Sequence, residues 1–249
     1  MAGLNRMLAG RWAVVTGGHV RVGRAISLEL AAARMNVIVT YRTSAAAAEG
    51  AVAELVTQGV QAHALGVDLR DAAAVVRLAD EVLALTGSSL GLLVNSASVY
   101  PQTPIGEISA DTWDAVFATN LRAPFLLSQK LGLAMKTAGG GHIVNIGDWA
   151  GMRPYRSYLP YVVSKAGLIH MTRALALELA PEVQVNCVCP GPVLLPKDFD
   201  SAAVAEARQQ TPLKRLGDPG EIARAVRYFA ESTFATGAIL TVDGGRLIA

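Results

Sequence analysis

The sequence predicts one α/β domain over residues 1–249, a doubly wound parallel sheet of about seven strands with helices on both faces. Short apolar runs alternate with segments of helical spacing along the whole chain. The apolar runs are continuous, which is typical of parallel strands that are buried on both sides. The chain has 249 residues, of which 52% are hydrophobic, and this is enough for one large core.

The strands are predicted from apolar runs, several of them rich in β-branched residues. They occupy 11–16, 37–41, 60–67, 90–95, 142–146, 183–188 and 238–242. Helices are expected between them, at 23–34, 71–85, 111–135, 158–179 and 218–230, and an Ala-rich helix capped by Thr43 or Ser44 runs to about 58. The helix over 71–85 is expected to carry one apolar stripe, formed by Val75, Leu78, Val82 and Leu85. Residues 190–216 are expected to form a long excursion that holds one short helix.

The bulk composition argues against several classes of function. A net charge of +2 comes with no basic stretch, so nucleic acid is not an expected partner. No apolar run approaches the ~20 residues of a membrane span, and residues 1–10 lack the apolar stretch of a secretory signal. The four His residues are scattered without metal-ligand spacing, so no metal site is expected.

The two cysteines, Cys187 and Cys189, stand two residues apart on a predicted strand. Their side chains point to the same face and cannot easily bond to each other. Buried, reduced thiols are therefore expected, and they indicate a cytoplasmic protein.

The loop from Thr16 to Gly23 joins the first strand directly to a helix. Glycines such as Gly17 and Gly23 permit close backbone approach, and the helix N-terminus offers free N–H groups to a pyrophosphate. The loop does not follow G-x-G-x-x-G, so a purely structural turn is the alternative. The position after the first strand favours a Rossmann-type dinucleotide site.

The second strand is followed by Tyr41, Arg42, Thr43 and Ser44. Sites that prefer NAD place an acid here for the ribose 2′-hydroxyl. A guanidinium beside two hydroxyls instead suits a 2′-phosphate, which Arg can hold through charge-assisted hydrogen bonds. NADPH is therefore the expected cofactor, and a solvated surface Arg42 is the alternative.

Tyr161 and Lys165 are an i, i+4 pair on one face of a predicted helix. A neighbouring ammonium favours the phenolate, so Lys165 is expected to lower the pKa of Tyr161 from about 10 and make it a proton donor and acceptor near neutral pH. Asp148 lies upstream on the preceding connection. It is either part of the same site or a structural acid that caps this connection.

Together these motifs resemble those of the short-chain dehydrogenases/reductases over nearly the full chain. The resemblance is carried, in order, by Thr16 to Gly23, Asp68, Asn95-Ser96-Ala97-Ser98, Asn120, Tyr161 with Lys165, Pro190-Gly191-Pro192 and Asp243-Gly244-Gly245. One position departs from the family pattern, since Ser96 replaces the second Asn of the usual Asn-Asn-Ala-Ser.

Three further departures resemble the pteridine reductases and dihydromonapterin reductases of that family. Arg21 takes the place usually held by the middle Gly of the turn. Residues 41–44 are similar to the subgroup's His-Arg-Ser motif for NADPH. Asp148 stands where most of the family has the catalytic Ser.

The resemblance implies an NADPH site and a catalytic group in named positions. The implied cofactor contacts are Gly17, His19, Arg21, Val22, Gly23, Tyr41, Arg42, Thr43, Ser44, Asp68, Leu69, Asn95, Ser96, Ala97, Tyr161, Lys165, Pro190, Gly191 and Val193. Hydride is expected to pass to a ring carbon of a pterin or dihydropterin, with Tyr161 relaying a proton to a ring nitrogen. Lys165 is expected to contact the nicotinamide ribose, Asp148 to hold Tyr161 and a water or substrate N–H, and Asn120 to help keep a relay water near Lys165.

The implied substrate contacts are Arg21, Ser98, Tyr100, Asp148, Tyr161 and Leu194. Tyr100 is placed to stack on a flat ring or is an ordinary loop residue, and Trp149 lines the pocket or packs in the core. Residues 192–216 are the expected substrate-binding lid, with Leu194, Leu195 and Phe199 facing the ligand. The C-terminus resembles that of homotetrameric members.

Two other functions remain open. The same fold and cofactor can serve the reduction of an unrelated carbonyl or imine. A catalytically silent NADP-binding regulatory protein is the alternative of another class, although the presence of Tyr161, Lys165 and Asn120 argues against it.

Overall fold

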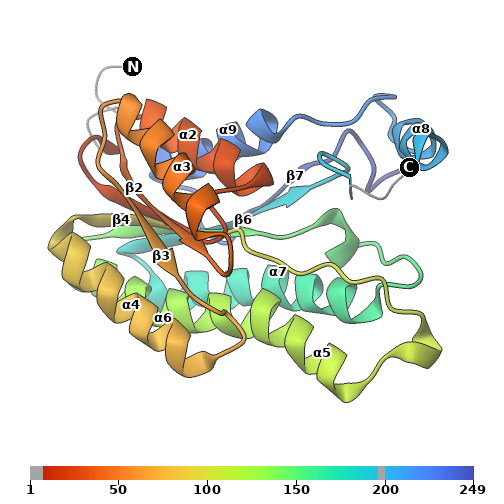
Figure 1. Cartoon of the computed structure of the whole chain (residues 1–249), viewed down its shortest axis with the longest axis horizontal. Helices are drawn as coiled ribbons and strands as arrows, with labels where there is room; N and C mark the ends of the chain where they lie inside the picture. Colours follow the sequence, from red (N-terminus) through yellow and green to blue (C-terminus); the bar gives the residue numbers. More distant parts are fainter. Residues whose placement is uncertain (1–7, 196–199) are drawn as a thin grey trace.

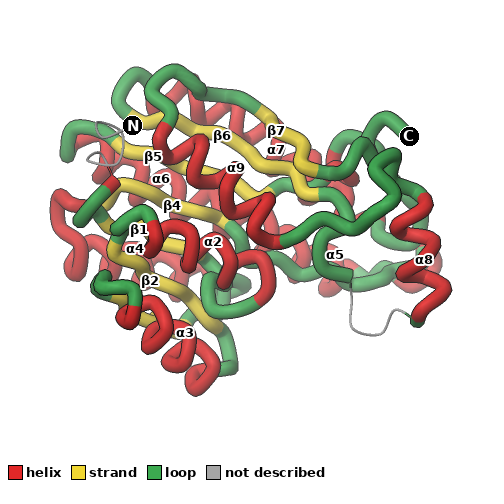
Figure 2. The backbone as a smooth tube through the Cα atoms, turned by 90° about the horizontal axis from the view of Figure 1, so that it is seen from above, coloured by secondary structure: helices red, strands yellow, loops and turns green. Residues whose placement is uncertain are grey.

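The computed structural model describes residues 8–195 and 200–249, and it confirms the predicted fold class. All strands are parallel and form one sheet (Figures 1 and 2), in the order β3-β2-β1-β4-β5-β6-β7. The strands are β1 (Trp12–Val15), β2 (Asn36–Tyr41), β3 (Ala62–Gly66), β4 (Leu90–Asn95), β5 (Gly141–Ile146), β6 (Val183–Pro190) and β7 (Ile239–Val242).

Helices cover both faces of this sheet (Figure 1). One face carries α2 (Arg21–Ala32), α3 (Ala45–Thr57) and α9 (Pro219–Glu231). The other face carries α4 (Ala72–Thr86), α5 (Ala110–Phe117), α6 (Ala123–Thr137) and α7 (Leu159–Leu179). The short helix α8 (Ser201–Gln209) stands apart from both layers, beside the C-terminal tail in both views (Figures 1 and 2). Within the described residues, no helix combines the length and apolarity that a membrane crossing requires.

The two faces of the sheet carry separate apolar cores. Neighbouring residues of β1 point into different ones, with Val15 packed in the core that includes Ile26 and Phe229, and Val14 in the core that includes Leu131. This two-sided burial is the reason why the strands read as continuous apolar runs in the sequence.

The sheet reverses its winding at β1, whose neighbours are β2 on one side and β4 on the other. In open α/β sheets the connections from two such strands diverge to opposite faces and leave a crevice at the carboxyl ends. The loop that joins β1 to α2 and the loop after β4 both begin at this crevice.

One residue of the expected stripe on α4 is misplaced. Val75, Leu78 and Val82 are buried, but Leu85 is 43% exposed. Thr86 takes the buried position in the last turn of the helix. Because successive helical residues are rotated about the axis, Leu85 falls at the edge of the stripe.

The predicted continuous helix over 111–135 is also wrong in detail. It is divided into α5 and α6 by a π-helical turn, η3 (Ala118–Arg122), which contains Asn120. Single π-helical turns often mark functional sites because they reorient the side chains of the bulged residues. The helix propensities of these residues do not predict this turn.

The expected cap of α3 by Thr43 or Ser44 is not formed. Ser44 occupies the N-cap position, but its side chain makes no capping hydrogen bond. Both hydroxyls are exposed and remain available to a ligand at the carboxyl end of β2.

Candidate active site

A cavity of about 880 Å³ opens at the carboxyl ends of the central strands. It is lined by every predicted site residue except Asn95 and Asn120. It is also lined by residues to which no site role was assigned from the sequence, among them Thr119, Tyr155, Tyr158, Ala207, Gln210 and Arg246. Phe199, expected on the lid, falls outside the described residues.

The turn after β1 is built as a close backbone cradle. Gly17 has a φ of 65°, and a Cβ on Gly23 would approach the Gly17 carbonyl oxygen to 2.3 Å. Ser27 donates to the carbonyls of Gly18 and Gly23 at 2.9 and 3.1 Å, which fixes the turn against α2. The N-terminus of α2 opens on the cavity, and its backbone N–H groups suit a pyrophosphate.

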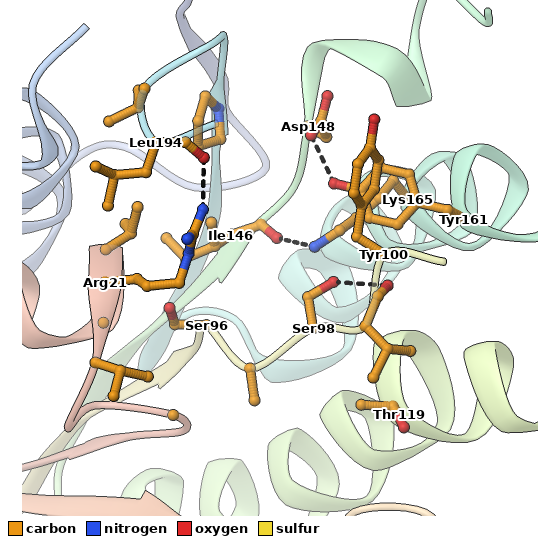
Figure 3. A pocket seen from close by; sticks show the side chains of 18 of the residues that line it. Arg21, Ser96, Ser98, Tyr100, Thr119, Ile146, Asp148, Tyr161, Lys165 and Leu194 are labelled. Atoms are coloured by element: carbon orange, nitrogen blue, oxygen red, sulfur yellow. Dashed lines mark hydrogen bonds between the residues drawn. The ribbon is translucent and has the colours of Figure 1, made fainter. Parts of the chain in front are cut away.

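Arg21 has a φ of 50°, in the left-handed region that favours glycine. This conformation is the physical reason why a glycine is usual at this place in the turn. The Arg21 guanidinium donates to the Leu194 carbonyl oxygen at 2.5 Å (Figure 3). Arg21 therefore links the phosphate turn to the loop that follows β6.

The end of β2 presents an unpaired cation to the cavity. Arg42 is exposed there and forms no ion pair with any described residue. The nearby acid Asp68 is engaged by Arg70 at 2.5 Å, and hydrogen bonds from Arg70 lower the pKa of Asp68 to about 2. The acid at this edge is thus neutralised, and Arg42 with Thr43 and Ser44 fits a 2′-phosphate.

Asp148, Tyr161 and Lys165 lie close together in the wall of the cavity (Figure 3). The Tyr161 hydroxyl donates to Asp148 Oδ2 at 2.6 Å, and Asp148 Oδ1 accepts from the Ala150 N–H at 2.8 Å. Lys165 Nζ donates to the Ile146 carbonyl oxygen at 2.8 Å and lies 5.7 Å from the centre of the Tyr161 ring. Asp148 therefore both caps the connection, as η4 (Trp149–Gly151) begins, and contacts the tyrosine.

The expected effect of Lys165 on Tyr161 is wrong in this arrangement. Burial and the adjacent Asp148 carboxylate raise the pKa of Tyr161 well above its ordinary value. Burial also raises the pKa of Asp148 and lowers the pKa of Lys165. Tyr161 is thus a neutral phenol whose proton is directed at Asp148.

Asn120 lies behind the cavity wall and uses its whole side chain within the protein. Its Oδ1 accepts from Ser98 Oγ at 3.1 Å and the Val99 N–H at 2.9 Å. Its Nδ2 donates to the Val99 carbonyl at 3.0 Å and to Ser164 Oγ at 3.1 Å. Both oxygen lone pairs and both amide hydrogens are therefore used, and the side chain fixes the loop after β4 to α7. Its expected role in holding a relay water stays a prediction.

Asn95 also lies outside the cavity. Its Nδ2 donates to Asn145 Oδ1 at 2.8 Å and to Ser128 Oγ at 3.2 Å. These bonds join β4 to β5 and α6, so the Asn95 side chain supports the site through the sheet.

Aromatic side chains form one wall of the substrate end. Tyr100 stacks on Tyr158 with ring centres 4.3 Å apart and meets Tyr161 edge-on at 4.6 Å. Its hydroxyl is 2.9 Å from that of Tyr155. Trp149 lies against Tyr155 at 5.4 Å and lines the cavity, so it belongs to the pocket wall.

Arg246 and Gln210 were missed, and the roles of Tyr155 and Tyr158 could not be separated from packing, because the place of all four depends on the tertiary fold. Arg246 follows Asp243-Gly244-Gly245, at the carboxyl end of β7. Ligands of open α/β sheets bind at that end of the strands, which is the one signal that could have identified Arg246.

Cys187 and Cys189 are confirmed as buried free thiols, with their sulfur atoms 3.7 Å apart. Among the described residues no group of three His, Cys, Asp or Glu is arranged to hold a metal ion.

The chain matches the family described as Enoyl-(Acyl carrier protein) reductase over residues 20–246. It is 37% identical to an uncharacterized oxidoreductase of Mycobacterium tuberculosis over 94% of this chain and 90% of the relative. It is 34% identical to the 3-oxoacyl-(acyl-carrier-protein) reductase of Synechocystis over 97% and 98% of the two chains. Its fold is similar to the crystal structure of FolM alternative dihydrofolate reductase 1 from Brucella canis complexed with NADP, with a TM-score of 0.89, 32% identity and coverage of 98% and 97%.

These similarities, together with the fold, show that the chain belongs to the short-chain dehydrogenases/reductases. It is a short-chain oxidoreductase, and Tyr161, Lys165 and Asp148 lie together in its cavity.

Proposed function

We propose that this protein is an NADPH-dependent reductase of a pterin or dihydropterin. The observation that carries the proposal is the 2.6 Å hydrogen bond from Tyr161 to a carboxylate, Asp148. The flat aromatic wall beside this pair suits a heteroaromatic ring. The similarity to FolM alternative dihydrofolate reductase 1, at 32% identity, supports the same substrate class.

The cofactor half of the cavity fits NADPH. The Gly17–Gly23 cradle and the N-terminus of α2 would hold the pyrophosphate, and Arg42 would hold the 2′-phosphate. Lys165, buried and directed toward the cavity floor, would contact the nicotinamide ribose. When bound, NADPH supplies a hydride to a ring carbon of the substrate C=N bond and becomes NADP+.

The chain's own residues handle the proton. As the C=N π bond is lost, Tyr161 gives its hydroxyl proton to the ring nitrogen, so that carbon and nitrogen each gain one hydrogen. The phenolate that forms is reprotonated from solvent, and Asp148 orients the hydroxyl for each turnover. Asp148 also offers an acceptor to a ring N–H, which a ketone substrate lacks.

A carbonyl substrate is the second candidate, since the relative in Synechocystis is named a 3-oxoacyl-(acyl-carrier-protein) reductase. Reduction of a carbonyl develops negative charge on its oxygen. In that reaction a carboxylate at Asp148 would repel the oxygen where a hydroxyl would donate to it. This disagreement favours the pterin over the carbonyl.

The test is the oxidation of NADPH, followed by its absorbance, with dihydrobiopterin, dihydrofolate, a 3-oxoacyl thioester and a simple ketone. Turnover of a dihydropterin is expected. Turnover of the ketone or thioester alone would refute the pterin assignment. Tight NADPH binding without any turnover would instead support a catalytically silent NADP-binding protein.

The assembly and location are proposed by resemblance. A homotetramer is expected for a chain with this C-terminus, and light scattering coupled to size-exclusion chromatography tests it. A cytoplasmic location agrees with the two free thiols.

A further inference from the structure

Arg246 is a cation in the substrate end of the cavity. Its guanidinium lies 4.8 Å over the Trp149 ring, and Nη2 donates to Gln210 Oε1 at 2.6 Å. Gln210 follows α8, so the C-terminal tail and the excursion after β6 meet at this point (Figure 2). A guanidinium has five N–H groups, and one described bond uses one of them.

The backbone after β7 is shaped to present this side chain. Gly244 and Gly245 have φ values of 63° and 85°. The Asp243 carboxylate accepts from the N–H groups of Gly245 at 2.9 Å and Leu247 at 2.8 Å, which closes the turn around Arg246. A Cβ on Gly245 would approach Pro212 to 2.7 Å, so the turn is packed against the excursion. The position of Arg246 is therefore fixed by the fold.

A row of rings connects Arg246 to the catalytic tyrosine. From Trp149 the row continues to Tyr155, whose hydroxyl contacts that of Tyr100, and Tyr100 meets Tyr161 edge-on. Arg246 and Tyr161 thus stand at the two ends of this series of contacts. A flat ligand that lies along the rings with its reduced end at Tyr161 would bring its other end toward Arg246.

Arg246 has no acidic partner among residues 8–195 and 200–249. The two acids that line the cavity, Asp68 and Asp148, are engaged by Arg70 and Tyr161. Arg153 adds a second positive charge beside Arg246, and its guanidinium donates to the Arg246 carbonyl oxygen at 3.2 Å. Among residues 8–195 and 200–249, the negative charge of Glu206 acts against that of Arg153 and has the smaller effect on the pKa of Arg246. The end of the cavity is thus electropositive and offers free donors.

We infer that the substrate carries a carboxylate at the end remote from its reduced ring, and that Arg246, held by Trp149 and Gln210, binds it. This inference rests on the proposed function, because it assigns the far end of the same substrate. Among dihydropterins it selects those with an acidic tail over those with a neutral one. Charge-assisted hydrogen bonds to guanidinium are strong and directional, which suits this discrimination.

Two substrates that share the pterin ring test the inference. Dihydrofolate has a carboxylated tail, and dihydrobiopterin has a neutral one. In Arg246→Gln the KM for dihydrofolate is expected to rise about 10- to 100-fold, the loss of a hydrogen bond to a charged group, with kcat little changed. The KM for dihydrobiopterin is expected to change less than about twofold, since that tail gives Arg246 no charge to bind. Equal effects on the two substrates, or none, would overturn the inference.

The control is Arg156→Gln, which removes a positive charge from the loop of Tyr155 at an exposed side chain outside the cavity wall. It should leave both KM values unchanged. Arg246→Lys keeps the charge without the planar fork, and it is expected to recover part of the affinity for dihydrofolate.

A binding measurement separates this inference from the proposed reaction. p-Aminobenzoylglutamate and its neutral diamide are titrated into the NADP-loaded protein by calorimetry. The wild type is expected to bind the acid at least about tenfold more tightly, and Arg246→Gln to lose that preference. No preference in the wild type contradicts the anion site, even if pterins are reduced. A preference without pterin turnover supports the site and refutes the proposed function.

Discussion

Tyr161 donates its hydroxyl proton to Asp148 at 2.6 Å, and in this pair the phenol is buried and the carboxylate is partly buried. The contact joins a phenol and a carboxylate whose pKa values are both raised, by burial in each case. Charging either group is therefore unfavourable, and perturbed pKa values of this kind are typical of functional sites. Its consequences can be measured separately on stability, on pH dependence and on substrate choice.

Replacing Asp148 by Asn should change how stability depends on pH. The pKa of Asp148 is raised in the folded state above its ordinary 3.8, so the folded protein holds the proton more tightly than the unfolded chain. Wild-type stability should fall as the pH rises from about 3.8 through the folded-state pKa, and this loss should be absent in Asp148→Asn. Urea denaturation at pH values from 4 to 8 measures it, and parallel curves for the two proteins would contradict the shift.

The alkaline limb of activity reports on Tyr161 as the proton donor. Because burial and Asp148 raise the pKa of Tyr161 well above 10, kcat should hold up as the pH approaches about 10. Asp148→Ser removes the negative charge and should move the alkaline limb to lower pH. If the alkaline limb of the pH–activity profile stays in place in Asp148→Ser, Asp148 does not raise the pKa of Tyr161.

Arg42 should decide the choice of cofactor. In Arg42→Ala the Kd for NADPH is expected to rise about 10- to 100-fold, because the charge-assisted hydrogen bonds to the 2′-phosphate are lost. NADH lacks this phosphate, so its Kd serves as the internal control and should change little. Fluorescence titration of both cofactors measures the difference. An equal loss of affinity for NADPH and NADH would show that Arg42 does not bind the 2′-phosphate.

Arg21 stores backbone strain that a glycine would relieve. Both Arg21→Gly and Arg21→Ala lose the bond to the Leu194 carbonyl, but only Ala keeps a side chain at a φ of 50°. Arg21→Gly should therefore be about 1 kcal/mol more stable than Arg21→Ala. The same pair at Arg24, inside α2, is the control and should show the reverse order, since Ala is the better residue within a helix. Chemical denaturation gives all four values.

The fold and the cofactor half of the site were predictable because local patterns determine them. Apolar runs identified all seven strands, and the turn after β1 and Arg42 after β2 both line the cavity as expected. The errors arose where tertiary packing, and not local sequence, determines which residues are buried and where a helix is interrupted. Leu85 lies at the edge of its stripe, and η3 interrupts a sequence that reads as one helix.

The substrate half was less predictable for a physical reason. Tyr155, Gln210 and Arg246 reach the cavity from segments far apart in the chain, and no local spacing connects them. The i, i+4 spacing also suggested that Lys165 controls the pKa of Tyr161. Instead, burial and the Asp148 carboxylate raise the pKa of Tyr161, and Lys165 Nζ donates to the Ile146 carbonyl oxygen.

Asp148 is expected to direct this site to a ring nitrogen, and the sharpest test is the ratio of kcat/KM for dihydrobiopterin to kcat/KM for a ketone. The wild type should favour the dihydropterin. Asp148→Ser should lower this ratio by about 100-fold or more, the usual contribution of a positioned proton transfer, here the one from Tyr161 that Asp148 orients, without changing the Kd for NADPH. A wild type that favours the ketone, or an Asp148→Ser variant with an unchanged ratio, would contradict it.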